Sequence, residues 1–414
     1  MKKRVVITGL GAVTPLANNV RETWQGLLAG TSGIAPISAY DASELPVRFC
    51  GEIKNFTVEG VISAKEARKI DPFIQYALVA ADEAVRDSGI SIDDSNSERT
   101  GVIIGAGIGG LLGITEGYKT FLEKGARRVT PFYVPRSIIN MAAGHVSMHF
   151  GIKGPSLATV TACTSGTHSI GQAARMIQYG DADIMVAGGT EMSSCNMGIA
   201  GFAAAKALST NNDNPAGASR PWDKDRDGFV LADAAGVVVL EELEIAKARG
   251  ANIYAEIIGF GMSSDAYHIT MPPEDGDGAY RAMRNTIADA GISAEQVDYI
   301  NAHGTSTPLG DRAEFIAVTR LLNGQTDTVK MSSTKSMTGH ALGAAGAIEA
   351  IFTALAVKND IAPPTINLDN PEPDFVGIDL IANTAKEFAI HYALSNSFGF
   401  GGTNGSLLLK KYND

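Results

Sequence analysis

The order of structural elements that the sequence indicates occurs twice, and this weak duplication constrains the fold most. The segment Gly101-Val-Ile-Ile-Gly-Ala-Gly matches Val297-Asp-Tyr-Ile-Asn-Ala-His-Gly in position. Cys163 and the small-residue helix after it match the turn that ends at His340 and its helix. Although the identity is low, this order predicts two halves of one architecture that face each other, with a site at their junction. We expect the first half to span residues 1–250 and the second 251–414.

Short β-branched runs that end in glycine indicate strands, and alanine-rich segments that stop at glycine indicate helices. The expected strands are Arg4–Gly9, Gly101–Gly105, Ile184–Gly188, Val237–Leu240, Val297–Ala302 and Ser406–Lys410. The expected helices are Ile74–Ser88, Ser165–Tyr179, Tyr280–Ala290 and Gly343–Val357, with a charged helical link over Glu241–Gly250. Strands that alternate with helices predict an α/β fold with parallel sheet layers covered by helices.

Composition narrows the class of protein. A chain of 414 residues that is 45% hydrophobic and 19% charged is long enough for two or three globular domains. Its three cysteines, Cys50, Cys163 and Cys195, argue against a disulfide framework and predict a reducing, cytoplasmic compartment. The net charge of −11 argues against general nucleic-acid binding. We see no apolar run near the ~20 residues of a membrane span.

Cys163 is the strongest candidate for a nucleophile. It lies in Val160-Thr-Ala-Cys-Thr-Ser-Gly, where a helix N-terminus would favour the thiolate and lower the thiol pKa. His303 and His340 follow far downstream in glycine-flanked turns. One cysteine with distant histidines is typical of covalent thiol catalysis. The alternative is a buried structural cysteine with two core histidines, and the three glycine-framed contexts favour catalysis over it.

Five motifs carry a family resemblance. They are Thr161-Ala-Cys-Thr-Ser-Gly, Asp223-Lys-Asp-Arg-Asp-Gly-Phe-Val, Asn301-Ala-His-Gly-Thr-Ser-Thr-Pro-Leu-Gly-Asp, Ser333-Thr-Lys-Ser-Met-Thr-Gly-His and Asn396-Ser-Phe-Gly-Phe-Gly-Gly-Thr-Asn. Together they resemble the β-ketoacyl-[acyl-carrier-protein] synthases, and most closely the bacterial synthase II group of elongating condensing enzymes. The resemblance covers the chain from the first strand to the last. It implies a thiolase-type fold, with two similar βαβαβαββ halves in a layered αβαβα arrangement, and a homodimer.

The resemblance also implies a decarboxylative condensation. An acyl chain moves from acyl carrier protein to Cys163, and malonyl-carrier protein then loses CO₂ and attacks the acyl group. His303 and His340 would each donate an N–H to the malonyl thioester oxygen. The backbone N–H groups of Cys163 and Phe400 would form the oxyanion hole, and Phe400, between glycines, would gate the pocket. No cofactor is implied beyond the phosphopantetheine that carries the substrates.

Further site residues follow from the same resemblance. Lys335 would lie inside the site, although a solvated loop lysine is the alternative, and its partner there would be Glu349. Glu349 is instead a candidate ligand of a structural sodium or potassium ion, with Asn301, Ala302, Ser395 and Asn396. Thr305 and Thr307 would hold the phosphopantetheine arm, unless they only stabilise their turn.

Two surfaces are implied for the substrates. The acyl pocket would be lined by Ile108, Leu111, Phe202 and Leu342, with Tyr133 donated by the second subunit; plain core is the alternative for each. Carrier proteins are acidic, and so is this chain, so docking needs a local basic patch. Its candidates are Lys65, Arg68, Lys69, Arg127, Arg128 and Lys206, for which a solvated face is the alternative.

Within the family, the residue at the third catalytic position distinguishes priming enzymes, thiolases and elongating enzymes. Priming enzymes resemble a Cys-His-Asn arrangement and thiolases use a second cysteine, whereas this chain has His340, which favours elongation. A polyketide ketosynthase and a chain-length partner subunit without a working thiol are the rivals. One segment departs from the family: Ala232-Asp-Ala-Ala-Gly stands where glycines are usual, which puts local packing in doubt.

Overall fold

Ten strands form one sheet in the computed structural model, which describes residues 2–413, in the order β10-β9-β13-β14-β8-β1-β7-β6-β4-β5. The first half contributes β1 (Val5–Val13), β4 (Thr100–Gly105), β5 (Ser156–Leu157), β6 (Ile184–Glu191) and β7 (Ala234–Glu242). The second contributes β8 (Ala255–Ser264), β9 (Tyr299–Asn301), β10 (Lys330–Ser332), β13 (Tyr392–Gly399) and β14 (Thr403–Lys410). The two half-sheets join where β1 pairs antiparallel with β8.

The strand directions repeat between the halves. In the first half, β4 runs parallel to β5 and β6, while β7 runs antiparallel to β6 and β1. In the second half, β9 runs parallel to β10 and β13, while β14 runs antiparallel to β13 and β8. The duplicated α/β fold is therefore confirmed. The boundary between 250 and 251 stays a prediction; it falls between α9 (Leu243–Ala248) and β8.

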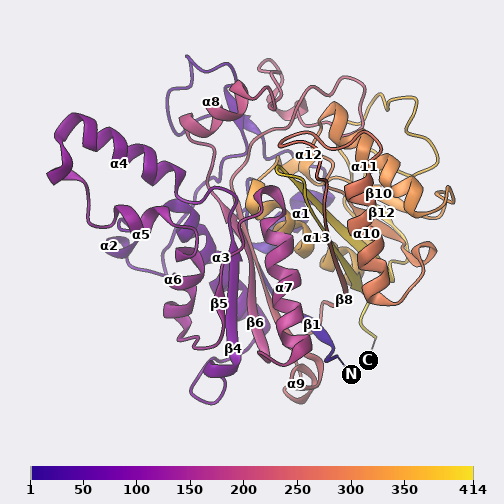
Figure 1. The fold of residues 1–414 in the computed structure, drawn as a ribbon, viewed down its shortest axis with the longest axis horizontal. Coiled ribbons are helices and arrows are strands. Elements are labelled where there is room, and N and C mark those ends of the chain that lie inside the picture. Colours follow the sequence, from indigo (N-terminus) through magenta and orange to yellow (C-terminus); the bar gives the residue numbers. More distant parts are fainter. Residues whose placement is uncertain (1, 414) are drawn as a thin grey trace.

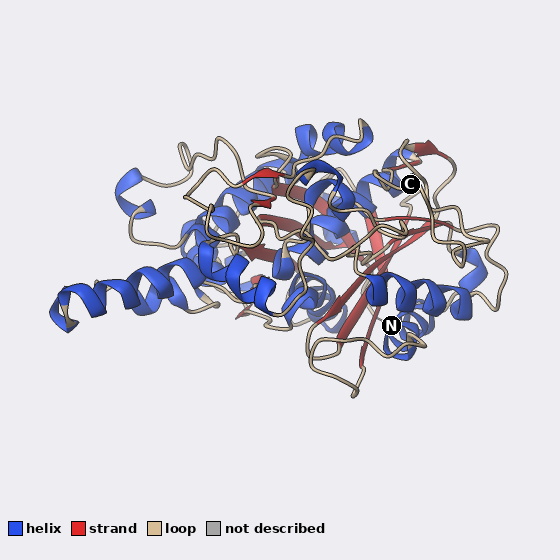
Figure 2. Ribbon diagram, turned by 90° about the horizontal axis from the view of Figure 1, so that it is seen from above, coloured by secondary structure: helices blue, strands red, loops and turns tan. Residues whose placement is uncertain are grey.

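Helices form three layers around the two half-sheets (Figures 1 and 2). The outer helices of the first half are α3 (Pro72–Ser88) and α6 (Met141–Phe150), and those of the second are α10 (Asp277–Ala290) and α11 (Pro308–Leu321). The helices α7 (Ser165–Tyr179) and α13 (Ala345–Asn359) pack between the half-sheets. Along β7 the valines alternate accordingly, because Val237 and Val239 pack under α3 while Val238 faces α13.

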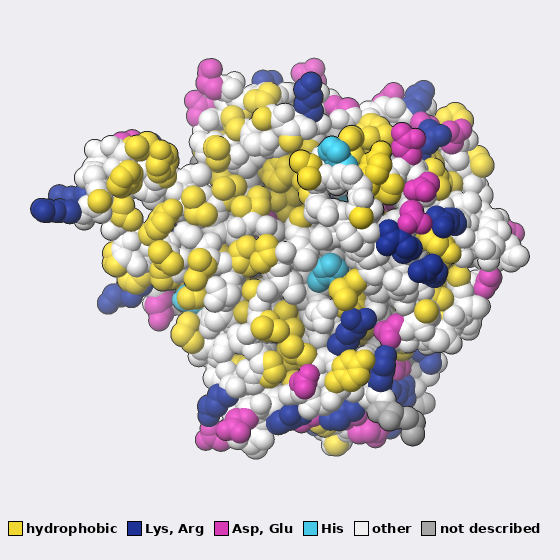
Figure 3. All heavy atoms as spheres, in the orientation of Figure 1, with side chains coloured by type: hydrophobic (Ala, Val, Ile, Leu, Met, Phe, Trp, Pro, Cys, Tyr) yellow, Lys and Arg dark blue, Asp and Glu magenta, His cyan; other side chains and the backbone are white. Residues whose placement is uncertain are grey.

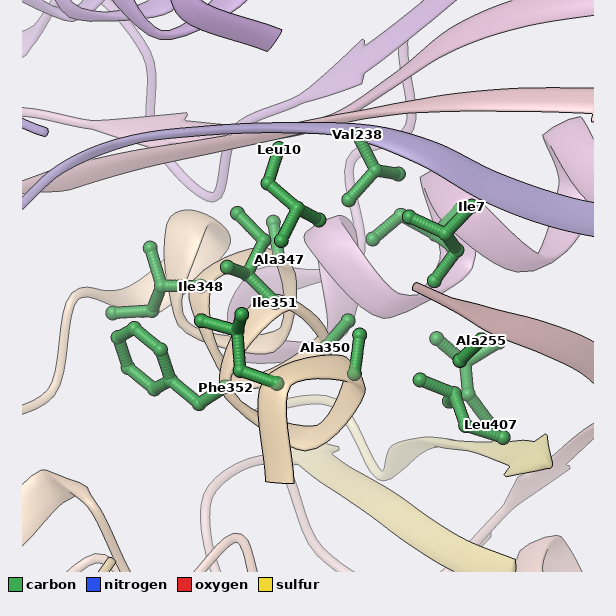
Figure 4. Close-up of a cluster of buried hydrophobic side chains, with 14 of the residues drawn as sticks. Ile7, Leu10, Val238, Ala255, Ala347, Ile348, Ala350, Ile351, Phe352 and Leu407 are labelled. Atoms are coloured by element: carbon green, nitrogen blue, oxygen red, sulfur yellow. The ribbon is translucent and has the colours of Figure 1, made fainter. Parts of the chain in front are cut away.

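The middle layer explains the composition of α13. Figure 4 shows Ala347 and Ile351 of this helix against Leu10 of β1, with Val238 close by and Leu407 of β14 on another side. A helix with neighbours on all sides is apolar all round. The stretch Leu342–Asn359 is consequently long and apolar enough to cross a membrane by length and composition, but 89% of it is buried inside the protein.

Most of the remaining elements lie outside these layers at the surface, whereas the short helix Lys335–Thr338 is buried. They are α1 (Val20–Leu28), β2 (Ala35–Pro36), β3 (Phe49–Cys50), α2 (Ala64–Ala67), α4 (Leu111–Lys124), α5 (Tyr133–Ser137), α8 (Asn196–Ala204), α12 (Lys335–Thr338), β11 (Ile361–Ala362) and β12 (Lys386–Glu387). The helix α4 projects from the body of the molecule on the side of α5 (Figures 1 and 2).

The departure at Ala232 is accommodated by its neighbours. A Cβ on Gly51 would lie 2.7 Å from the Ala232 Cβ, and one on Gly339 would lie 3.0 Å from it. The two glycines thus leave the space that the added methyl group fills. Ala232 and Ala234 are both fully buried in the cluster that contains α13.

Candidate active site

Cys163 lies in a tight turn that leads into α7. The 3-10 turn Ala162–Thr164 precedes the helix, and Ala162 adopts the left-handed conformation at φ 51°. The second half repeats this turn as Leu342–Ala344 before α13, with Leu342 at φ 44°. By this equivalence, Gly343 occupies in the second half the position that Cys163 occupies in the first.

The structure brings the three predicted catalytic side chains together. Cys163 of the first half and His303 and His340 of the second line one cavity of about 500 Å³. Phe398 and Phe400, from the β13–β14 hairpin, line it as well. Residues separated by up to 237 positions, from Cys163 to Phe400, therefore share one cavity at the junction of the halves.

Backbone contacts fix the two histidines. Glu314 of α11 accepts hydrogen bonds from the N–H of His303 at 2.9 Å and of Gly304 at 2.8 Å. His340 donates its N–H to the Val230 carbonyl at 2.7 Å and accepts from the Ala232 N–H at 3.0 Å. Hydrogen bonds to the backbone therefore fix both turns, and the rings are free to face substrate.

The histidines are neutral at physiological pH. Burial lowers the pKa of His303 and of His340 well below the ordinary value of 6.5, and the Lys335 charge adds to the effect. A neutral imidazole carries one N–H donor and one acceptor nitrogen. The pair can therefore present donors to an oxygen that gains negative charge.

The thiol of Cys163 differs from the expectation. Burial raises its pKa to about 11, against opposing effects of the Phe400 backbone N–H, the Lys335 charge and its own backbone N–H. The predicted lowering is wrong for this structure, because α7 begins two residues later, at Ser165, and the sulfur is enclosed. The two backbone N–H groups directed at the sulfur are those that sequence resemblance assigned to the oxyanion hole.

Lys335 is buried and not a solvated loop residue. It is the first residue of α12, is 1% exposed, and forms an ion pair with Glu349 of α13. Burial raises the pKa of Glu349 to about 7, and Lys335 opposes that rise. The cation that depresses the histidine pKa values is thus held by a carboxylate inside the protein.

Several polar atoms near this pair are buried without a partner. Within residues 2–413, both side-chain atoms of the Asn301 amide, Oε2 of Glu349 and Oγ of Ser395 make no hydrogen bond. Asn301 and Ser395 are direct partners in the β9–β13 pairing. The Asn396 amide is different, because its Nδ2 donates to Glu314 and its Oδ1 accepts from Ser406. In the same described range, no group of three or more His, Cys, Asp or Glu side chains is placed to hold a metal.

The predicted substrate-binding residues are only partly in place. Thr305 and Thr307 line the cavity, with their hydroxyl oxygens 3.0 Å apart. Phe202 and Leu342 also line it. Ile108, Leu111 and Tyr133 do not line this cavity in the single chain, so their part of the acyl pocket, for Tyr133 in a second subunit, stays a prediction.

Their positions give the reasons. Ile108 packs in the apolar cluster that contains Cys163 and Leu342, behind the cavity wall. Leu111 is the first residue of α4, and the Tyr133 ring packs on α4, where a Cβ on Gly117 would lie 2.4 Å from it.

The predicted docking cations lie on three segments. Lys65 and Arg68 are exposed on and just after α2, and Lys69 places its ammonium 5.4 Å from the Phe132 ring centroid. Arg127 and Arg128 are exposed in the turn after α4. Lys206 is exposed after α8 and lines the cavity mouth.

The sequence interpretation missed residues that support the site. Phe229 packs edge-on against His340, with ring centroids 5.2 Å apart. Glu314 and Glu191 accept hydrogen bonds from backbone N–H groups around the site. Neither is a motif residue with a predicted chemical role. Only the buried setting of a carboxylate on an otherwise apolar element could have indicated them.

A duplicated α/β fold with a cysteine and two neutral histidines at the junction of its halves defines a thiolase-type condensing enzyme. Family models match accordingly: "Beta-ketoacyl synthase, N-terminal domain" over residues 2–246 and "Beta-ketoacyl synthase, C-terminal domain" over 254–369. The chain belongs to the β-ketoacyl synthase family. It is an acyl-transferring enzyme of the condensing step in fatty acid elongation.

Individual relatives agree with this assignment. The chain is 56% identical to 3-oxoacyl-[acyl-carrier-protein] synthase 2 of Vibrio cholerae, over 99% of each chain, and 54% identical to that of Coxiella burnetii, over 100% of each. A solved β-ketoacyl synthase of Burkholderia phymatum is 37% identical, with a TM-score of 0.92 over 99% of this chain and 100% of that one. A type II polyketide ketosynthase, solved in complex with its acyl-carrier protein, is 33% identical, with a TM-score of 0.92 over 100% of both chains.

Proposed function

We propose that this chain is an elongating 3-oxoacyl-[acyl-carrier-protein] synthase in which the first half supplies the nucleophile and the second half the decarboxylation donors. The observation that carries the proposal is the single cavity shared by Cys163, His303 and His340. The 56% identity to a fatty acid synthase, against 33% to a polyketide ketosynthase, favours fatty acyl substrates. An intact thiol disfavours a chain-length partner subunit.

Acyl transfer comes first. The Cys163 sulfur attacks the carbonyl carbon of acyl-carrier protein, a new C–S bond forms, and the bond to the phosphopantetheine sulfur breaks. The proton of the Cys163 thiol goes to the departing phosphopantetheine thiolate. Because burial raises the pKa of the thiol to about 11, proton loss accompanies substrate binding and attack. The N–H groups of Cys163 and Phe400, already directed at this place, stabilise the tetrahedral oxyanion.

Decarboxylation follows. The bond between the malonyl carboxylate and its α-carbon breaks, CO₂ leaves, and the electron pair forms an enolate whose oxygen carries the charge. His303 and His340 each donate one N–H to that oxygen, because both are neutral. The enolate carbon attacks the acyl-cysteine carbonyl, the C–S bond breaks, and the Cys163 thiolate takes up a proton. The product is a 3-oxoacyl-carrier protein two carbons longer.

Lys335 keeps the histidines unprotonated and Glu349 keeps Lys335 in place. The partnerless oxygens of Asn301, Glu349 and Ser395 fit a sodium or potassium ion, which takes neutral oxygens and one carboxylate. Backbone carbonyls of Ala302 and Asn396 would complete that set. The ion would supply structural rigidity and no chemistry.

Substrate contacts extend from the cavity to the surface. Thr305 and Thr307 hold the phosphopantetheine arm, Phe202 and Leu342 line the acyl pocket, and Phe400 gates it. Acyl carrier protein docks on the basic residues Lys65, Arg68, Lys69, Arg127, Arg128 and Lys206. Such a partner is acidic, and these cations, all exposed except the half-buried Lys69, give it a local basic surface on a chain whose net charge is −11.

A second copy of the chain covers the side of α4 and β5. Apolar side chains gather on this projecting side (Figure 3). The exposed ones here are Ile114, Tyr118, Phe121, Leu122, Phe132, Val134, Ile138, Met148, Leu157 and Val160. Leu157 is 49% exposed on the edge strand β5, so a homodimer would remove both an apolar patch and an open edge from water. Tyr133 would then reach the partner's pocket, and the dimer would work in the cytoplasm without nucleic acid or membrane.

The test is intact-mass analysis. The protein is mixed with acyl-carrier protein and then with malonyl-carrier protein. A stable acyl adduct on Cys163, followed by formation of 3-oxoacyl-carrier protein, supports the proposal. An unmodified protein that still releases CO₂, or no product from the acylated protein, would contradict it.

A further inference from the structure

Glu191, the last residue of β6, is a buried carboxylate that the reaction does not use. It is fully buried and accepts four backbone N–H groups, from Gly107 at 2.6 Å, Ile108 at 3.1 Å, Gly109 at 3.0 Å and Gly343 at 3.0 Å. In residues 2–413 no lysine or arginine forms an ion pair with it. A carboxylate that accepts this many hydrogen bonds is fixed in place by the surrounding backbone, and it also fixes the position of that backbone.

The four donors come from both halves. Gly107–Gly109 follow β4 in the first half, whereas Gly343 follows His340 in the second. The two backbones touch: a Cβ on Gly343 would lie 2.2 Å from the Gly107 nitrogen. A Cβ on Gly107 would lie 2.8 Å from the Glu191 carboxylate. Glu191 therefore joins two turns at a contact with no space for another side chain.

Two apolar side chains on these turns, that of the donor Ile108 and that of Leu342 next to the donor Gly343, pack beside the nucleophile. Ile108 and Leu342 pack in the same apolar cluster as Cys163, and Leu342 lines the cavity. Leu342 is held at φ 44°, a left-handed conformation that is unfavourable for a residue with a side chain. The hydrogen bond from the adjacent Gly343 N–H to Glu191 offsets that cost.

We propose that Glu191 is a positioning residue that fixes Ile108 and Leu342 relative to Cys163 and so sets which acyl chain lengths fit on the thiol. The inference rests on the proposed acylation of Cys163. After burial, the charge of Glu191 also contributes to the raised pKa of the Cys163 thiol.

Glu191→Gln tests the proposal. A glutamine amide has one acceptor oxygen and an NH₂ group, so it cannot accept all four N–H groups: Oε2 of Glu191 takes those of Gly107 and Gly343, and Oε1 takes those of Ile108 and Gly109. We expect the ratio of acylation rates for a long over a short saturated acyl-carrier protein to change by about tenfold, as loss of a hydrogen bond to a charged group would cause. The rates are measured by intact mass. Glu191→Asp, which keeps the charge, should change the ratio less.

Glu83→Gln is the matched control. Glu83 on α3 also accepts two backbone N–H groups, from Ala12 and Val20, but these residues pack in a different cluster from Cys163. It should lower the melting temperature and leave the ratio unchanged. An unchanged ratio in both Glu191 variants, or loss of folded protein in both, would overturn the inference, because the carboxylate would then serve the fold alone. If the unmodified protein takes no acyl group on Cys163, the proposed function itself fails, which the first mass spectrum shows.

Discussion

The imidazole rings of His303 and His340 stand almost perpendicular, at 88°, with their centroids 5.3 Å apart. Two neutral rings at this distance can direct one N–H each at a common oxygen, whereas two charged rings would repel each other. Burial and Lys335 together keep them neutral. The electrostatic state of the pair is therefore part of the fold and does not depend on substrate.

Replacing the nucleophile should remove the adduct. Cys163→Ala is expected to gain no mass from acyl-carrier protein, because Cys50 and Cys195 are buried with raised pKa values and line no part of the cavity. Intact mass followed by peptide mapping measures this. An acyl group mapped to either of the other cysteines would show that the assignment is wrong.

The histidine variants should separate decarboxylation of malonyl-carrier protein from acylation of Cys163. In His303→Ala and His340→Ala, release of CO₂ from malonyl-carrier protein should fall by about 10²–10³, the usual cost of one oxyanion donor. Acylation of Cys163 should persist, because its oxyanion hole is made of backbone N–H groups. A variant that decarboxylates at the normal rate would remove that histidine from the mechanism.

Thiol reactivity should rise with pH. Since the pKa of Cys163 is raised to about 11, only a small fraction is thiolate at neutral pH, and that fraction grows about tenfold for each pH unit below the pKa. Alkylation of the free enzyme by a small uncharged reagent should follow this increase. A plateau reached below pH 8 would mean that the resting thiol is activated after all.

The contribution of the two histidines to stability should fall on the acid side of neutrality. The folded pKa of His303 and of His340 lies below the ordinary value of 6.5, so the unfolded chain binds protons first as the pH drops. Their contribution is complete above about pH 6.5 and is lost below it. The melting temperatures of the wild type and His303→Phe, measured from pH 8 to 5, should converge toward low pH; parallel curves would contradict this.

Removing one partner of the buried ion pair between Lys335 and Glu349 should lower the free energy of unfolding. Lys335→Met leaves the Glu349 carboxylate buried without its partner, and a loss of about 3–5 kcal/mol in the free energy of unfolding is expected. The double variant Lys335→Met/Glu349→Leu should lose less. Chemical denaturation measures both; equal losses in the single and double variants would show that the two groups act independently.

Docking should be separable from chemistry. Reversing the charges of Lys65, Lys69 and Arg127 should raise KM for acyl-carrier protein, and the effect should shrink in high salt. Alkylation of Cys163 by a small uncharged reagent should be unchanged, because that reagent does not dock. An unaltered KM at low salt would place the docking surface elsewhere.

The sequence predicts the elements whose signals are local. Ser165–Tyr179 agrees with its helix from end to end, and Ile74–Ser88 misses only Pro72 and Phe73, because glycine marks each C-terminus. The strand β8 escapes prediction because Gly259 and Gly261 interrupt its apolar pattern. Those glycines are required by the close approach of α10, whose carbonyls would lie 2.5 and 2.3 Å from an added Cβ.

The features of the site likewise fall into those with a local sequence signal and those without one. Motif residues such as Cys163 and His340 are visible in the sequence, whereas the raised pKa of the thiol arises from enclosure by segments hundreds of residues away. The position of Ile108 behind the cavity wall likewise depends on which turns meet, and Glu191 alone links them. Such properties belong to tertiary contacts and have no local pattern.

Because Gly343 is the structural equivalent of Cys163, the second half of the molecule shows the same turn without a thiol. The same strained turn precedes the same kind of central helix twice, and only one copy carries sulfur. Whatever reactivity Cys163 gains therefore comes from what surrounds it: the hairpin with Phe400, the two imidazoles and the buried ammonium. The second copy of the turn has no room for a thiol, because a Cβ on Gly343 would lie 2.2 Å from the Gly107 nitrogen, so the nucleophile is confined to the first half.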